Sequence, residues 1–353
     1  MSNKIEIIET TLRDGSYPIN FAFNSTDTAI ICKELQEAGF KYIEVGHGVG
    51  LNASNRGLGQ AAQTDEEYMQ AADSVLDRAK YGMFCIPGIA RLEDIDVAAK
   101  NNMDFIRIGT NVTEVESSKD FIATAKECGM FVTSNFMKSY ALPAREFAQK
   151  VLLAQEFGTD MVYLVDSAGG MFNTNIHQYY EAVREVSDIP LGFHGHDNLS
   201  LALANSLEAI NLGFAFVDSS LQGLGRSSGN AATETLVAAL LKLGYDLDID
   251  LLKVLDIGQK YVHPLITTPG RAPLDIISGF ADFHSSYMHY IQEYATKYSI
   301  NPALLIIEIS KIDKVNVDEK VLKKVAERIR DHENVYLGRF GWNRYVGREQ
   351  DSF

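Results

Sequence analysis

Short apolar runs alternate with longer amphipathic segments along the first two thirds of the chain. The runs are rich in β-branched and aromatic residues, which is typical of strands, and they fall at residues 5–8, 42–45, 81–86, 105–108, 130–134, 161–165, 190–193 and 214–217. Apolar residues in the longer segments recur with helical spacing and predict helices at residues 25–39, 65–80, 92–101, 117–129, 143–157, 175–186, 199–212 and 231–243. Most of the strands are apolar throughout, as expected for a parallel sheet that is covered on both faces.

This succession of eight strand–helix units predicts a (β/α)8 TIM barrel over residues 1–245. An open doubly wound sheet is the alternative. The even repetition favours closure, and so do polar residues such as Asp14 and His194 at the C-terminal ends of strands, where barrel enzymes carry their chemistry. Residues 246–353 have helical patterns without this alternation. We expect a mostly helical C-terminal region there, which makes oligomer or partner contacts or covers the barrel mouth.

The net charge and composition argue against several classes of function. The chain has 353 residues and a formal net charge of −15, which disfavours a nucleic-acid partner because phosphate binding needs a basic surface. Its N-terminal apolar run is too short for a signal peptide, and no apolar stretch approaches the length that spans a bilayer. Cys32, Cys85 and Cys128 are too sparse for a disulfide framework. We therefore expect a cytoplasmic protein without a membrane or nucleic-acid partner.

A candidate metal site combines residues from two strand ends that are distant in the sequence. His194 and His196 are two residues apart after the seventh strand, so their side chains point to the same side, toward the barrel mouth. Asp14 follows the first strand, which lies only one strand away from the seventh in a closed barrel. A carboxylate with two imidazoles suits Mn²⁺, Mg²⁺, Fe²⁺ or Zn²⁺, and Asn230 could add a carbonyl oxygen. The alternatives are a pair of surface histidines and, for Asn230, a helix N-cap.

Two further polar residues are candidates for substrate binding. Arg13 precedes Asp14, and a guanidinium beside a metal can stabilise an enolate oxygen or clamp a carboxylate. The alternative for Arg13 is an ion pair with Asp14 or Glu9. Ser167 is followed by Ala168 and two glycines, a composition that suits the close approach of a carboxylate to backbone N–H groups. A plain turn at the strand end is the alternative for this segment.

These residues lie in motifs that resemble a known family. Thr11-Leu12-Arg13-Asp14-Gly15-Ser16 resembles the opening motif of the barrel metallolyases that include 3-hydroxy-3-methylglutaryl-CoA lyase and isopropylmalate synthase. Four other segments are similar to the 4-hydroxy-2-oxovalerate aldolases in particular, namely residues 44–48 (EVGHG), 163–171 (YLVDSAGGM), 193–206 (FHGHDNLSLALANS) and 223–230 (GLGRSSGN). The likeness runs in order from residue 5 to about residue 310.

The resemblance implies a metal-dependent lyase that cleaves a 4-hydroxy-2-oxo acid to pyruvate and an aldehyde, or joins them, through a pyruvate enolate. Mn²⁺ is the metal we expect, with Mg²⁺, Co²⁺ or Zn²⁺ as alternatives. By this likeness the metal ligands are Asp14, His194 and His196, while Arg13 stabilises the enolate and Ser167 and His47 contact the substrate.

The sequence departs from the aldolase pattern at two positions. The aldolases have a histidine after the Arg-Asp-Gly-Ser motif as the favoured base, and this chain has Tyr17 there. They have a tyrosine before a Ser-Ser-aromatic stretch, and this chain has His284 there. We hypothesise that the two side chains have exchanged places over the substrate, so that His284 transfers the proton and Tyr17 hydrogen-bonds the aldehyde or hydroxyl oxygen. The alternative is that Tyr17 merely packs and the native reaction differs.

Two other functions compete with the aldolase. A Claisen-type acyltransferase that condenses acetyl-CoA with a 2-oxo acid usually has Gly-Glu-Arg in the loop before Asn230, where this chain has Gly225-Arg226-Ser227-Ser228. A barrel that serves only as a binding subunit has no packing reason to gather a set of metal ligands at one mouth.

The aldolases also work with an acylating aldehyde dehydrogenase through their C-terminal region, which residues 336–345 do not resemble. The sequence therefore assigns neither this partner nor the identity of the aldehyde. We expect the protein to form a homodimer.

Overall fold

The computed structural model describes residues 5–266 and 272–332 of the chain. Parallel strands close into a barrel in chain order, with β1 paired to both β2 and β8, so the predicted TIM barrel is confirmed and the open sheet is excluded. The strands are β1 (Glu6–Glu9), β2 (Tyr42–Glu44), β3 (Lys80–Cys85), β4 (Phe105–Asn111), β5 (Phe131–Met137), β6 (Met161–Asp166), β7 (Leu191–Gly195) and β8 (Phe216–Ser219).

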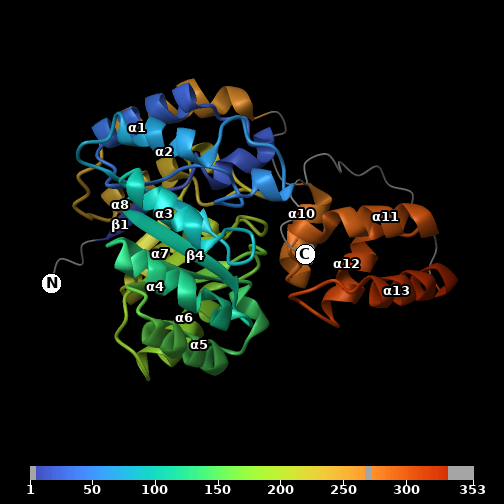
Figure 1. Cartoon of the computed structure of the whole chain (residues 1–353). Coiled ribbons are helices and arrows are strands. Elements are labelled where there is room, and N and C mark those ends of the chain that lie inside the picture. The colour runs from blue at the N-terminus through green and yellow to red at the C-terminus, as the bar shows by residue number, and fades with distance from the viewer. Residues whose placement is uncertain (1–4, 267–271, 333–353) are drawn as a thin grey trace.

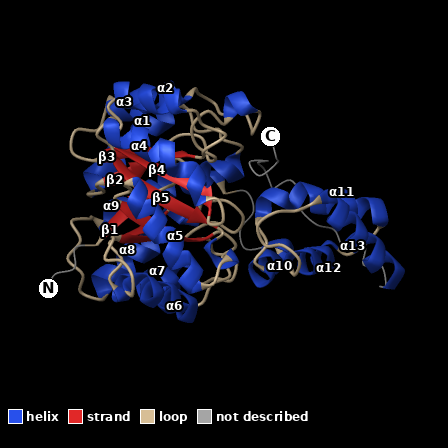
Figure 2. Cartoon of the chain, turned by 60° about the horizontal axis from the view of Figure 1, so that its bottom comes forward, coloured by secondary structure: helices blue, strands red, loops and turns tan. Residues whose placement is uncertain are grey.

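A helix follows each strand and packs on the outside of the barrel, so that the strands form the centre of this part of the molecule (Figure 2). These helices are α1 (Ser25–Ala38), α2 (Asp65–Asp73), α3 (Leu92–Lys100), α4 (Lys119–Glu127), α5 (Ala144–Phe157), α6 (Asn173–Arg184), α7 (Ala202–Leu212) and α8 (Thr233–Lys242). Local sequence sets many of their ends. Asn24, for example, accepts hydrogen bonds from the N–H groups of Thr26 and Asp27 at the start of α1. Gly39 ends the same helix at a φ of 105°, which favours glycine.

Helix α2 is shorter than the sequence predicts. The apolar spacing predicts a helix over residues 65–80, but the helix ends at Asp73. The Gln36 side chain on α1 explains the difference, because its Oε1 accepts hydrogen bonds of 2.8 to 3.0 Å from the backbone N–H groups of residues 77–79. These N–H groups cannot then donate within a helix, and the chain passes directly into β3.

A second group of helices stands to one side of the barrel (Figure 1). It consists of α10 (Pro273–Ala281), α11 (Met288–Tyr298), α12 (Pro302–Ser310) and α13 (Glu319–His332), and its apolar side chains form a core of their own from Leu274 onward. The intervening α9 (Leu251–Ile257) packs instead with the barrel core, which extends to Ile266. The change of core therefore falls between Ile266 and Leu274, and the C-terminal region is mostly helical as predicted. The division after residue 245 stays a prediction.

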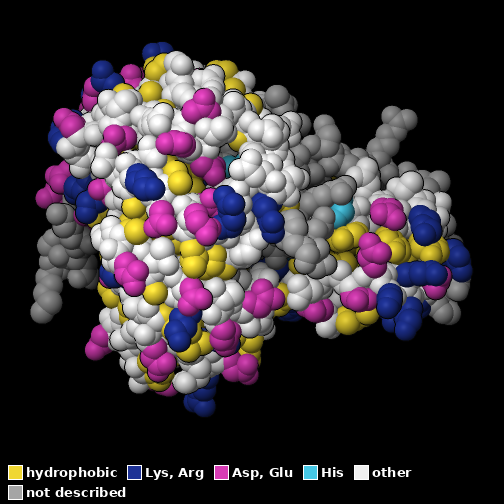
Figure 3. Space-filling view, viewed as in Figure 1, with side chains coloured by type: hydrophobic (Ala, Val, Ile, Leu, Met, Phe, Trp, Pro, Cys, Tyr) yellow, Lys and Arg dark blue, Asp and Glu magenta, His cyan; other side chains and the backbone are white. Residues whose placement is uncertain are grey.

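The barrel mouth faces the second group of helices. Arg13 and Ser167 lie just past strand ends, and they line one cavity together with His284, which precedes α11. Acidic and basic side chains are interspersed over the face of the molecule seen in Figure 3. Within the two described ranges, no helix has both the length and the apolar character that crossing a bilayer needs. Residues 336–345, the tail segment for which the sequence analysis found no match, lie outside the described part of the chain.

Candidate metal centre and active site

The structure brings together the three metal ligands that the sequence predicts. Asp14 begins a short 3-10 turn after β1, His194 lies in β7, and His196 follows the end of that strand. One ligand atom from each residue lies within 4.8 Å of the others, and all three side chains are buried. Strands β1 and β7 both pair with β8, so closure of the barrel is what places the carboxylate opposite the imidazoles. A carboxylate and two imidazoles are a common ligand set for a divalent metal ion.

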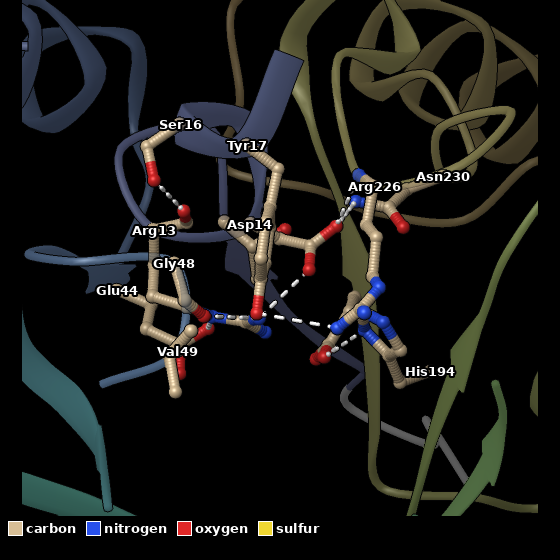
Figure 4. A network of polar contacts seen from close by, with 12 residues as sticks. Arg13, Asp14, Ser16, Tyr17, Glu44, Gly48, Val49, His194, Arg226 and Asn230 are labelled. Atoms are coloured by element: carbon tan, nitrogen blue, oxygen red, sulfur yellow. Dashed lines mark hydrogen bonds and ion pairs between the residues drawn. The ribbon is translucent and has the colours of Figure 1, made fainter. Parts of the chain in front are cut away.

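Hydrogen bonds hold the Asp14 carboxylate in place (Figure 4). Its Oδ1 accepts from Arg13 Nη1 at 2.7 Å, and its Oδ2 accepts from Asn230 Nδ2 at 2.7 Å and from the Arg226 backbone N–H at 3.3 Å. Burial raises the pKa of Asp14, but the positive charge of Arg13, the neighbouring histidines and the Asn230 hydrogen bond outweigh it and hold the pKa well below its usual range. The carboxylate is therefore ionised at neutral pH.

Both histidines are oriented through Nδ1. His194 Nδ1 lies 2.8 Å from Asp218 Oδ2, and His196 Nδ1 lies 3.3 Å from the Gly229 carbonyl oxygen. Because an acceptor faces Nδ1, the neutral form of each ring has its proton on Nδ1 and its lone pair on Nε2. Burial also lowers the pKa of His196 to about 3, so this ring is neutral at pH 7. Neutral imidazoles with a fixed tautomer are the form in which histidine binds a metal ion.

Asn230 has a free carbonyl oxygen beside the metal ligands. Its Nδ2 donates to Asp14, but its Oδ1 is buried and accepts no hydrogen bond from the described residues. A buried amide oxygen without a partner is costly, and a divalent cation is a suitable partner for it. Asn230 does not initiate α8, which begins at Thr233. The donor set and this oxygen therefore fit a bound divalent metal ion.

Arg13 belongs to a chain of buried charges inside the barrel. Its Nε donates to Glu44 Oε2 at 2.9 Å, and Arg107 Nη1 donates to the same oxygen at 2.9 Å. Arg107 also pairs with Asp218, which holds His194. The Arg13 guanidinium thus contacts Asp14 and Glu44, two of its neighbours at the mouth, rather than Glu9. These pairs fix its plane against the cavity wall.

The predicted site residues, with two exceptions, line one cavity that opens to solvent. The predicted residues in its wall are Arg13, Asp14, Tyr17, Ser167, His194, His196 and His284. Asn230 lies behind Asp14. His47 is turned away from the cavity, since its Nε2 lies 3.0 Å from the Gly59 carbonyl oxygen and its Nδ1 accepts from the Val49 N–H. Its ring stacks on Phe21 and shapes the loop that brings Val49 to the cavity.

Tyr17 and His284 both reach the cavity wall from opposite ends of the chain. Arg226 connects their surroundings, since its Nη1 donates to the Tyr17 hydroxyl at 3.4 Å and its Nε donates to Ser285 Oγ at 2.9 Å. His284 Nδ1 lies 2.6 Å from Ser286 Oγ. The Ser286 backbone N–H donates to the same nitrogen at 3.4 Å, so Nδ1 acts as a hydrogen-bond acceptor. Burial and the nearby charge of Arg226 lower the pKa of His284 well below its ordinary value, so the ring is neutral at pH 7.

The Ser167 hydroxyl group can donate a hydrogen bond into the cavity. Its Oγ accepts a hydrogen bond of 2.9 Å from the Lys138 backbone N–H, so its own O–H remains able to donate. The glycines that follow do not present N–H groups to a ligand, because the Gly170 N–H donates to the Asp166 carboxylate. Gly170 instead permits close packing, since a Cβ there would come within 2.3 Å of the Gly279 carbonyl oxygen.

The chain is similar to known proteins over most of its length. The HMGL-like family model matches residues 4–260. The chain is 36% identical to the 4-hydroxy-2-oxovalerate aldolase of Carboxydothermus hydrogenoformans, over 92% of this chain and 97% of that one. It is 35% identical to the enzyme of the same name from Moorella thermoacetica, over 93% of this chain and 97% of that one.

The chain belongs to the HMGL-like family. The predicted resemblance to the 4-hydroxy-2-oxovalerate aldolases is thereby confirmed. Solved structures share the fold of this HMGL-like protein: the carboxyl transferase domain of Rhizobium etli pyruvate carboxylase has a TM-score of 0.77 at 15% identity, covering 94% of this chain and 61% of that one. The HMG-CoA lyase of Bacillus subtilis has a TM-score of 0.63 at 19% identity, covering 76% and 96%.

The site of this HMGL-like protein contains residues that sequence reasoning did not assign to it. Arg226 lines the cavity, and Asp218 orients a candidate metal ligand. Phe84, Ile86 and Met137 supply apolar wall near the ends of β3 and β5. In the sequence analysis, Arg226 was used only to distinguish the loop before Asn230 from the corresponding loop of the acyltransferases. Its place in the loop that follows β8, at the barrel mouth, was the available signal, because that face carries the chemistry of such barrels.

Proposed function

We propose that this protein is a divalent-metal-dependent aldolase that cleaves or forms a 4-hydroxy-2-oxo acid from pyruvate and an aldehyde. One observation carries the proposal, namely that Asp14, His194 and His196 gather at a cavity that Arg13 and Ser167 also line. The names of the relatives support it, since proteins similar over nearly the whole chain are 4-hydroxy-2-oxovalerate aldolases. Phe84, Ile86 and Met137 give the cavity apolar wall beside its charged and polar groups, a lining that suits a small-molecule substrate.

Asp14, His194 and His196 would hold the metal ion, and the buried Oδ1 of Asn230 would be a further ligand. Mn²⁺ is the ion we propose, because carboxylate and carbonyl oxygens with imidazoles suit it, while Mg²⁺, Co²⁺ and Zn²⁺ are alternatives. When bound, a divalent ion supplies Lewis-acid polarisation that lowers the free energy of an enolate.

The protein's own residues bind and orient the 2-oxo acid. Ser167 donates its free O–H to the substrate carboxylate, because its oxygen already accepts from Lys138. Arg13 faces the developing enolate oxygen as a fixed positive charge, held by Glu44 and Asp14 so that it need not reorganise during the reaction. His284, whose neutral ring lines the cavity, takes the proton from the C4 hydroxyl in cleavage and returns it in condensation. Tyr17 hydrogen-bonds the oxygen at the same carbon.

Exchange of pyruvate protons tests the proposal directly. The protein loaded with Mn²⁺ is incubated with pyruvate in D₂O, and the methyl signal is followed by proton NMR. We expect loss of the methyl protons, followed by formation of a 4-hydroxy-2-oxo acid when an aldehyde is added. A protein that exchanges no pyruvate protons but turns over acetyl-CoA with a 2-oxo acid would instead be a Claisen-type acyltransferase.

Replacing His284 by Ala is expected to lower aldol turnover about a hundredfold or more, the scale of general acid–base catalysis. Turnover and bound Mn²⁺ are measured together, because the substitution should leave the metal in place. The matched control is His177→Ala, a half-exposed histidine on α6 outside the cavity. Retained turnover in the His284 variant with metal still bound would reject the base role.

We propose further that the protein is a cytoplasmic homodimer. Its three free cysteines are compatible with a reducing compartment. An acylating aldehyde dehydrogenase, which would consume the aldehyde product, is the partner that the aldolase resemblance suggests. Sedimentation of the purified protein, alone and mixed with such a dehydrogenase, measures both associations.

A further inference from the structure

Lys138 connects the barrel to the second group of helices. It directly follows β5 and is fully buried. Its Nζ donates a hydrogen bond of 2.6 Å to the carbonyl oxygen of Val315, between α12 and α13, and lies 3.5 Å from the hydroxyl of Tyr287. The Tyr287 hydroxyl donates to the same carbonyl oxygen at 2.9 Å. These groups form a polar contact between two parts of the molecule that have separate apolar cores.

The backbone of Lys138 contacts the substrate side of the same junction. Its N–H donates to Ser167 Oγ at 2.9 Å, and Ser167 is the proposed donor to the substrate carboxylate. Lys138 has a φ of 57°, a left-handed conformation that a residue with a side chain seldom adopts. Such a conformation costs free energy and is kept only where the surrounding contacts determine it. The backbone and the side chain of Lys138 are thus both held at fixed places.

Tyr287 belongs to the segment that brings His284 to the cavity. His284 caps a short 3-10 turn that ends at Tyr287, and the Tyr287 N–H donates to the His284 carbonyl oxygen at 3.3 Å. The Tyr287 side chain is buried in the core of the second group, and its ring centre lies 5.0 Å from Lys138 Nζ. A displacement of Tyr287 would therefore displace His284 as well.

The hydrogen bond from Lys138 to Val315 does not require a charge on the lysine. Burial lowers the pKa of Lys138 to about 7, the charge of Arg226 acts in the same direction, and Glu114 and Asp313 oppose it. The ammonium group and the neutral amine both have N–H groups that a carbonyl oxygen can accept. Removing the nitrogen, rather than changing the pH, is therefore the way to remove this contact.

We propose that Lys138 is a positioning residue, which fixes His284 relative to a substrate whose carboxylate is bound by Ser167. This inference rests on the proposed aldolase function. Lys138 contacts Ser167 through its backbone and the segment of His284 through its side chain, so it sets the distance between the carboxylate site and the base. Catalysis depends steeply on such a distance, because a misplacement of about 1 Å can lower a rate about a hundredfold.

The first test is Lys138→Met, which keeps a long buried side chain but removes its N–H groups. We expect kcat for aldol turnover to fall about tenfold or more, while KM for pyruvate and bound Mn²⁺ change by less than about twofold. Pyruvate proton exchange should persist, because it does not involve the C4 oxygen on which His284 acts. The matched control is Lys311→Met, since Lys311 is 63% exposed and pairs with Glu308 inside the second group.

A double variant distinguishes positioning of His284 from a general loss of packing. In His284→Ala no imidazole is left to align, so adding Lys138→Met should lower kcat further by less than about twofold. A loss of the same size with and without His284 would overturn the inference, and so would normal turnover of Lys138→Met.

If Lys138→Met does not fold, Tyr287→Phe replaces it in the same cycle, because it removes only the hydroxyl at the other end of the contact. Its kcat should fall about threefold or more, and this loss should vanish in His284→Ala. Unchanged turnover, or an equal loss without His284, would then overturn the inference.

Failure of the aldolase function itself looks different. It would appear as absence of pyruvate proton exchange in the natural protein, and the inference would fall with it. Failure of this inference alone leaves exchange and aldol turnover of the natural protein intact, while the effects of the Lys138 and His284 substitutions multiply.

Discussion

Replacing Asp14 by Asn is expected to abolish tight Mn²⁺ binding and to lower aldol turnover about a thousandfold or more. Asp14 supplies the negative charge among three ligand groups whose atoms lie within 4.8 Å of one another. The amide keeps the shape of the side chain but removes the charge that attracts a divalent ion. Metal content after desalting is measured by elemental analysis, and turnover is measured with pyruvate and an aldehyde.

The matched control is Asp248→Asn. Asp248 pairs with Lys41, its side chain is 76% exposed, and Lys41 directly precedes β2 at the opposite end of the barrel. The control should bind metal and turn over like the natural protein. An Asp14→Asn variant that keeps a full complement of Mn²⁺ and normal turnover would contradict the proposed metal site.

Replacing Arg107 by Met is expected to lower the free energy of unfolding by about 3 to 5 kcal/mol. Arg107 is fully buried inside the barrel and pairs with both Glu44 and Asp218. Met fills a similar volume but leaves two buried carboxylates without this partner, and an uncompensated buried charge is costly. Urea denaturation followed by circular dichroism measures the change.

Arg78→Met serves as the control for this effect, because Arg78 is 69% exposed and pairs only with the neighbouring Asp77 among its ion pairs within the described residues. Its substitution should change the free energy of unfolding by less than about 0.5 kcal/mol. If the Arg107 variant were as stable as the control, the buried network would contribute nothing measurable to folding. Its role would then be limited to orienting Arg13 and His194.

Local patterns account for most of the barrel. The continuous apolar strands and the helical spacing between them depend on near neighbours in the chain, and the structure has a strand or a helix at each predicted place. Ends of elements were less predictable. Helix α2 stops early because Gln36, far away in the sequence, accepts hydrogen bonds from residues 77–79. The apolar spacing within residues 65–80 gives no indication of that contact.

The metal group was predictable because barrel closure follows from the strand–helix rhythm, and closure alone puts Asp14 near His194 and His196. Residue type and strand-end position were enough for this group. They were not enough for His47, which shares a strand-end position but turns both ring nitrogens to the backbone of its own loop. Side-chain direction depends on contacts that a linear pattern does not contain.

The amino-acid sequence by itself determined the type of fold, the candidate metal ligands and the family, because each follows from residue types at short or regular spacing. The tertiary structure decided which side chains complete the cavity. It alone joined Arg226 to Tyr17 and Ser285, set His284 in the wall, and placed the change of core after Ile266. The physical reason is that hydrogen bonds and packing between distant segments depend on how helices and loops are seated against one another, which local spacing does not specify.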